Sequence, residues 1–69
     1  MRQFTPASSN IAGVSYDDET KALTVDFLDG SRYQYSRVPP EVYDAFERAP
    51  SAGSFLYRQI RDRYPYVSL

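Results

Sequence analysis

The sequence predicts a small α+β domain in which a three-stranded antiparallel meander is followed by two helices packed on one face, in the order β-β-β-α-α. Two segments of alternating apolar and polar residues, 22–28 and 31–37, flank an Asp29-Gly30 pair that is typical of a β-hairpin. Apolar residues recur at helical spacing on both sides of Pro50. The length of 69 residues predicts one domain.

The beginning of the chain has the least regular pattern. Residues 1–9 predict a flexible N-terminal arm, because they include Pro6 and small polar residues and show no periodicity. We therefore expect a single domain over residues 10–69. Within it, residues 10–16 predict a first strand, and the polar residues 17–20 predict a turn.

The loop of the hairpin decides which face of the sheet Tyr33 and Tyr35 occupy. A two-residue turn would place both rings on the exposed face, as an aromatic platform. A three-residue loop that ends in Gly30, as a left-handed bulge residue, would place them opposite Val25 and Leu23. Only the second register separates an apolar face from a polar one, so we predict the bulge.

The first helix is expected to begin after the third strand, where Val38-Pro39-Pro40 ends the sheet and Pro40 suits the first helical position. Pro50 ends this helix, because the residue before a proline is disfavoured in helical dihedrals. The predicted apolar stripe consists of Val42, Ala45, Phe46 and Ala49, with Tyr43 placed to reach back to Val38.

The second helix is expected to start at Ser51, which is a good N-cap, and to fade near Arg63. Its apolar stripe consists of Ala52, Leu56 and Ile60, with Phe55 adjoining. Residues 64–69 are too apolar for a free end, so we expect this tail to pack back on the domain or to meet a partner.

The composition excludes several classes of function. Cysteine and histidine are absent, which removes disulfides, thiolate zinc sites and the usual general base. We therefore expect no catalytic residues, no metal and no cofactor. No apolar run approaches the roughly 18 residues of a membrane helix, and no secretory segment is evident, so we expect a cytoplasmic protein without membrane contact. A net charge of −1 argues against a strong non-specific DNA binder.

The ordered motifs of this chain resemble those of the KTSC domain family over about residues 8–66. The matching segments are Ser8-Ser9-Asn10-Ile11, Val14-Ser15-Tyr16-Asp17, Leu23-Thr24-Val25-Asp26-Phe27, Gly30 with Tyr33-Gln34-Tyr35, Val38-Pro39-Pro40-Glu41-Val42-Tyr43, Ser51-Ala52-Gly53-Ser54-Phe55 and Ile60-Arg61. The tyrosine-x-tyrosine motif of the family falls on Tyr33 and Tyr35. KTSC domains also occur at the C-terminus of some lysyl-tRNA synthetases, so the resemblance implies an RNA-binding role. The chain differs from the family at Ala52, often a lysine there, and at Tyr57, often an asparagine.

The start of the second helix is the first candidate binding site. Ser51, Gly53 and Ser54 are small residues at a helix start, where free backbone N–H groups can receive a phosphate. Arg58 and Arg61 follow with a spacing that could extend such a contact. The structural alternative is that Ser51 caps the helix, Gly53 allows close packing and the arginines complement the helix C-terminus.

The second candidate site is the pair Tyr33 and Tyr35, which could stack on bases beside Arg32 and Arg37. The bulged register instead assigns these rings to the core, with hydroxyl groups that reach an edge or line a groove. The acidic run 17–19 lacks the spacing of a calcium loop and is expected to be a solvated turn.

These features predict a non-catalytic binding module for RNA or for a phosphate-bearing nucleotide. The alternative is a protein-interaction or homo-oligomerising module. That alternative rests on the apolar tail, residues 64–69, and on a free edge of the third strand.

Overall fold

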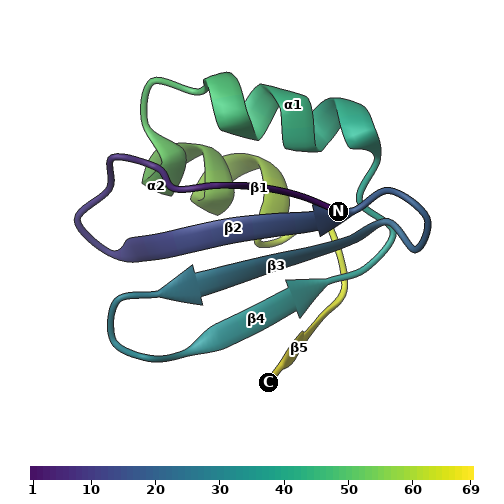
Figure 1. Cartoon of the computed structure of the whole chain (residues 1–69), viewed down its shortest axis with the longest axis horizontal. Coiled ribbons are helices and arrows are strands. Elements are labelled where there is room, and N and C mark those ends of the chain that lie inside the picture. Colours follow the sequence, from purple (N-terminus) through teal and green to yellow (C-terminus); the bar gives the residue numbers. More distant parts are fainter.

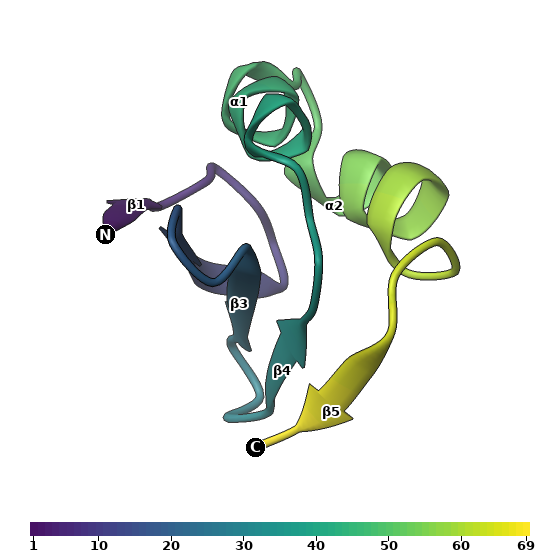
Figure 2. The same cartoon turned by 90° about the vertical axis from the view of Figure 1, so that its right-hand side faces the viewer.

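The computed structural model describes residues 1–69 and contains a five-stranded antiparallel sheet in the order β1-β2-β3-β4-β5, with the helical segments on one side (Figures 1 and 2). The strands are β1 (Arg2–Phe4), β2 (Ile11–Asp17), β3 (Ala22–Phe27), β4 (Arg32–Tyr35) and β5 (Tyr66–Ser68). The helical segments are α1 (Pro40–Arg48), α2 (Ala52–Phe55) and the π-helical turn η1 (Leu56–Ile60). The α+β class and the β2-β3-β4-α1-α2 order agree with the sequence prediction.

The β3–β4 hairpin has the predicted bulged register. Tyr33 lies opposite Val25, and Tyr35 lies opposite Leu23. Gly30 has a φ of +92°, in the left-handed region that favours glycine, and its N–H donates to the carbonyl oxygen of Phe27 at 3.0 Å. Both tyrosine rings therefore lie on the face of the sheet that the helices cover, and no exposed aromatic platform forms.

The structure differs from the sequence prediction at the N-terminus, where a flexible arm was expected over residues 1–9. Arg2–Phe4 instead form β1, which pairs with β2. The ring of Phe4 makes edge-on contacts with Tyr43 and Phe46, at centroid distances of 5.6 and 5.4 Å. Because these partners lie some forty residues away along the chain, local periodicity could not reveal the strand.

Arg2 adds a second set of long-range contacts to β1. Its guanidinium group lies 4.7 Å from the ring centroid of Tyr43 and 5.5 Å from that of Tyr16. The same group donates hydrogen bonds of 2.9 Å to the carboxylates of Asp18 and Asp44. Arg2 therefore joins β1 to the β2–β3 turn and to α1.

The C-terminal tail packs back on the domain as β5. Tyr66 lies opposite Tyr35 in β4, and the N–H of Leu69 donates to the carbonyl oxygen of Arg32 at 2.8 Å. The edge of β4, which the sequence analysis took to be free, is therefore covered. The open edges of the sheet are those of β1 and β5.

Helix α1 begins and ends as predicted from its prolines. Pro39 is the N-cap and Pro40 the first helical residue, while Ala49, before Pro50, has extended dihedrals of −66° and 137°. The predicted stripe is confirmed in part: Phe46 is buried and Val42 packs against the core, but Ala45 and Ala49 are only half-buried, and Tyr43, outside the stripe, is the second buried residue of the helix. The ring of Tyr43 stacks on that of Tyr16, at a centroid distance of 5.0 Å, which explains why this side chain is buried.

The second helical segment is shorter and less regular than predicted. The Oγ of Ser51 accepts a hydrogen bond from the N–H of Ser54 at 3.3 Å, which confirms the N-cap. The chain then forms η1, in which the N–H of Arg61 donates to the carbonyl oxygen of Leu56 at 2.9 Å. The predicted stripe is confirmed: Ala52, Leu56 and Ile60 are all buried. None of the helices has the length and apolar character required to cross a membrane.

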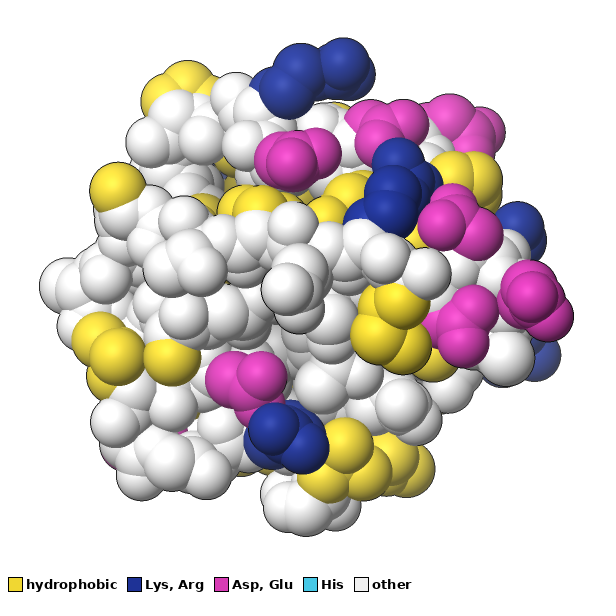
Figure 3. All heavy atoms as spheres, in the orientation of Figure 1, with side chains coloured by type: hydrophobic (Ala, Val, Ile, Leu, Met, Phe, Trp, Pro, Cys, Tyr) yellow, Lys and Arg dark blue, Asp and Glu magenta, His cyan; other side chains and the backbone are white.

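One hydrophobic core fills the space between the sheet and the helices. Its buried members are Ile11, Val14, Tyr16, Leu23, Val25, Tyr35, Val38, Tyr43, Phe46, Ala52, Leu56 and Ile60. No polar or charged residue is fully buried. Acidic side chains gather at the end of the molecule that holds the β2–β3 turn and the start of α1 (Figure 3), and two of them, Asp18 and Asp44, pair with Arg2.

Candidate functional site

A pocket of about 310 Å³ opens between the sheet and the α2–η1 segment. We call it the tyrosine pocket; its lining residues are Asn10, Phe27, Tyr33, Tyr35, Gly53, Leu56, Tyr57, Arg61 and Tyr66. Its volume lies at the lower end of the range of roughly 300–1,000 Å³ that is usual for small-molecule sites. The pocket is therefore of a size that suits a small ligand.

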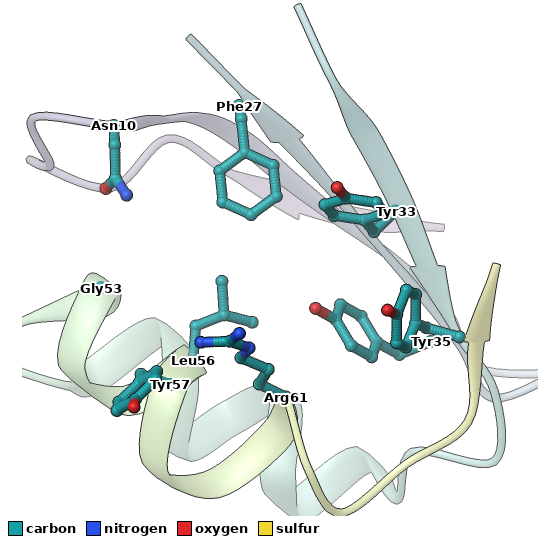
Figure 4. A pocket seen from close by; sticks show the side chains of 9 residues that line it. Asn10, Phe27, Tyr33, Tyr35, Gly53, Leu56, Tyr57 and Arg61 are labelled. Carbon is teal, nitrogen blue, oxygen red and sulfur yellow. The ribbon is translucent and has the colours of Figure 1, made fainter. Parts of the chain in front are cut away.

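Three neighbouring strands supply the aromatic wall of the tyrosine pocket. The ring of Tyr33 lies edge-on to Phe27 at 5.6 Å and to Tyr66 at 5.5 Å, and Tyr66 lies 5.6 Å from Tyr35. Antiparallel pairing explains this cluster, because it places Tyr35 and Tyr66 side by side on the same face. Figure 4 shows the rings of Tyr33 and Tyr35 facing the same gap as the guanidinium group of Arg61.

The aromatic side chains differ in depth. Tyr35 is buried, and burial is the largest cause of the upward shift in its pKa, to which Tyr66 adds. Tyr57 and Tyr66 are 61% and 55% exposed. The pocket therefore has a fixed aromatic floor and two exposed rings at its rim, where a flat ligand can stack.

Arg61 is the cation of the tyrosine pocket. The irregular turn η1 ends immediately before it, and π-helical turns of this kind are frequent at functional sites. The guanidinium carbon of Arg61 lies 5.1 Å from the ring centroid of Tyr57, within the range of a cation–π contact. The ion pairs of this protein involve Arg2 and Arg32, so the guanidinium group of Arg61 is free to bind an anion.

Gly53 lines the pocket without any backbone requirement for glycine. Its φ is not positive, and a Cβ built on it would meet only the Oδ1 of Asn10, at 3.7 Å. Alanine would favour the helix by up to about 1 kcal/mol relative to glycine. The missing side chain therefore leaves open the end of the pocket between α2 and Asn10.

The structure divides the residues of the predicted site into two groups. Tyr33, Tyr35, Gly53 and Arg61 come together in the tyrosine pocket. Ser51, Ser54 and Arg58 line a separate shallow groove, together with Ala49, Pro50, Phe55 and Gln59. The two serines share the capping hydrogen bond, and α2 is only four residues long, so the phosphate site expected at the helix start does not form one site with the tyrosines.

Sequence reasoning missed five lining residues, which are Asn10, Phe27, Leu56, Tyr57 and Tyr66. The position of Tyr66 follows from the pairing of β5 with β4. In the sequence, only the apolar character of residues 64–69 indicated that this tail packs back on the domain. Arg32, expected beside the tyrosines, lies on the opposite face of β4 and pairs with Asp26.

Both the sequence and the structure of this chain match known proteins over most of its length. Residues 7–64 match the KTSC domain. The chain belongs to the KTSC domain family. Its structure superposes on the crystal structure of a KTSC domain protein from Yersinia pestis with a TM-score of 0.89 and 28% identity, covering 99% of this chain and 96% of that one. This KTSC domain is also 40% identical over 53 residues to an uncharacterized protein of Stutzerimonas stutzeri, covering 77% of this chain and 75% of that protein.

This KTSC domain is related to longer proteins as well. It is 36% identical over 64 residues, 93% of its length, to a lysine–tRNA ligase of Nostoc punctiforme, and 34% identical over 64 residues to that of Trichormus variabilis. The chain spans 11% of the length of each ligase. Of the two positions that differ from the family pattern, Tyr57 lines the tyrosine pocket, whereas Ala52 is buried in the core.

Proposed function

We propose that this KTSC domain is a non-catalytic binding module for single-stranded RNA or for a phosphate-bearing nucleotide, and that the ligand enters the tyrosine pocket. The observation that carries the proposal is the combination of an aromatic wall with one unpaired arginine at a pocket of nucleotide size. The titratable side chains of the pocket are tyrosines and Arg61, and we assign none of them a catalytic role.

The aromatic rings supply the contact for a base. Stacking of a base on an aromatic side chain contributes about 1–3 kcal/mol in single-strand binding proteins. Tyr57 and Tyr66 are more than half exposed, and they flank the opening on opposite sides, one from η1 and one from β5. A base between them would remove apolar ring surface from water.

Arg61 supplies the contact for a phosphate. A guanidinium group can donate two parallel hydrogen bonds to phosphate oxygens, and its cation–π contact with Tyr57 holds it at the rim. The similarity to lysine–tRNA ligases, which are named for a tRNA substrate, supports RNA as the source of that phosphate.

A titration of the full chain tests the proposal. A labelled single-stranded RNA hexamer and free nucleoside monophosphates are titrated at about 100 mM salt, where phosphate contacts still contribute. Arg61→Ala is expected to lower the affinity roughly ten- to hundredfold, because it removes a charge-assisted contact of about 1.5–3 kcal/mol.

Arg58→Ala is the matched control. It removes the same charge three residues earlier in the chain, but Arg58 lines the separate groove and not the tyrosine pocket. We expect this variant to bind within about threefold of the wild type, a difference of the size that general electrostatics produces. Absence of wild-type binding, or equal losses in both variants, would contradict the proposal.

A self-associating module is the second candidate, favoured by the open edge of β5. Val67 and Leu69 are 54% and 63% exposed on this edge, and a second copy could add its own β5 in antiparallel pairing. Sedimentation of the wild type and of Val67→Lys over a range of concentrations tests it. A wild type that stays monomeric at every concentration would exclude self-association.

A further inference from the structure

Asn10 gives one end of the tyrosine pocket a defined hydrogen-bonding character. Its backbone carbonyl accepts the N–H of Leu28 at 2.9 Å, which anchors the residue at the end of the β3–β4 hairpin. Figure 4 shows its amide group pointing toward the gap above Gly53. A Cβ built on Gly53 would lie 3.7 Å from the Oδ1 of this amide, so the oxygen is the amide atom nearest to α2, and the whole amide lines the pocket.

The hydroxyl of Ser8 determines which way the Asn10 amide is turned. The Oγ of Ser8 accepts the backbone N–H groups of Asn10 and Ile11, both at 3.3 Å. Its lone pairs are therefore occupied, so its own hydrogen must be donated, and the group 2.9 Å away on Asn10 must be the amide oxygen, Oδ1. The Nδ2 group, a donor only, is left for the ligand.

A donor at this position distinguishes two kinds of nucleobase. Uracil and guanine carry a keto oxygen, O4 or O6, where cytosine and adenine carry an amino group. The keto oxygen accepts a hydrogen bond from an amide N–H, whereas an amino group would face it donor to donor. Single-stranded RNA is read along these base edges, once the base is unstacked.

We infer that Asn10, which lines the tyrosine pocket and is oriented by Ser8, selects a keto base, uracil or guanine, over an amino base there. This inference rests on the proposed RNA or nucleotide function. Asn10 is the residue that determines specificity, and the aromatic wall and Arg61 contribute affinity without regard to the base.

Uracil and cytosine provide the sharpest test, because they have the same size and differ only at positions 3 and 4 of the edge that carries the keto or amino group. Hexamers of uridylate and of cytidylate are titrated against the wild type, Asn10→Asp and the control Gln59→Glu. We expect the wild type to bind the uridylate hexamer about fivefold more tightly, the effect of one hydrogen bond. Asn10→Asp replaces the donor by an acceptor, so the preference should reverse.

The control separates base reading from charge. Gln59→Glu makes the same amide-to-carboxylate change at an exposed residue of the separate groove, so it should weaken both hexamers equally and keep the ratio. Equal wild-type affinity for the two hexamers, or an unchanged preference in Asn10→Asp, would overturn the inference and leave the proposed function standing. Absence of binding to the uridylate hexamer would overturn the inference, and absence of binding to every RNA and nucleotide of both titrations would overturn the proposed function as well.

Discussion

The ring of Phe46 in α1 lies parallel to the ring of Phe55 in α2, with centroids 5.4 Å apart and an interplanar angle of 12°. Phe46 also receives the edge of Phe4 from β1 and is fully buried. This single side chain therefore joins both helices to the edge of the sheet.

Phe46→Ala should lower the free energy of unfolding by about 3 kcal/mol or more, because it leaves a cavity among these three elements. The neighbouring exposed Glu47 is the control, and Glu47→Ala should change stability by no more than about 0.5 kcal/mol. Urea denaturation measures both. A loss below about 1 kcal/mol for Phe46→Ala would mean that α1 does not pack on the sheet as described.

Arg2 should stabilise β1 more than an ordinary surface arginine stabilises its strand. Arg2→Met keeps an apolar stem but removes two ion pairs and the cation–π contacts, so we expect it to lower stability more than the loss of one exposed ion pair does. Hydrogen exchange measures the effect locally: in Arg2→Met the backbone amides of β1 should exchange faster than in the wild type, and those of β3 should be affected less. Arg32→Met, which removes the exposed pair with Asp26, should cost no more than about 0.5 kcal/mol. Equal losses would argue against a special role for Arg2.

Gly53→Ala should separate stability from binding. The added methyl group improves helix propensity by up to about 1 kcal/mol, so the unfolding midpoint should rise. The same methyl group fills the space toward Asn10, so RNA affinity should fall. Thermal unfolding and the hexamer titration measure the two effects. A variant that is more stable and binds as well as the wild type would show that this end of the pocket holds no ligand.

Alkaline solutions should destabilise the fold through its buried tyrosines. Burial is the largest cause of the raised pKa values of Tyr16, Tyr35 and Tyr43. A pKa that is higher in the folded state favours the neutral form there, so the contribution is complete below about pH 10 and is lost as the pH rises through the folded-state pKa. Urea unfolding between about pH 9 and about pH 11 should show this loss. Tyr43→Phe removes one titrating group, and its stability should fall less steeply; an identical pH dependence would refute the assignment.

The hairpin illustrates how far local reasoning reached into the fold and the site. A sheet of this kind needs one apolar face toward the helices, and this condition was sufficient to predict that Gly30 forms a bulge and that Tyr33 lies opposite Val25. The same parity placed both tyrosines beneath the helices. It could not predict that β5 would bring Tyr66 beside them, because that pairing joins residues about thirty positions apart.

The sequence alone was enough to determine the strands β2 to β4, the starts of α1 and α2, and the three-residue loop of the hairpin. Each of these features depends on a periodicity, a proline or a turn residue within a few positions of the chain. Tertiary packing decided the rest. It formed the strands β1 and β5, stacked Tyr43 on Tyr16, and brought Asn10, Gly53 and Arg61 together around one pocket. These contacts lie between distant segments, and their free energy appears only when the sheet and helices close over the same core.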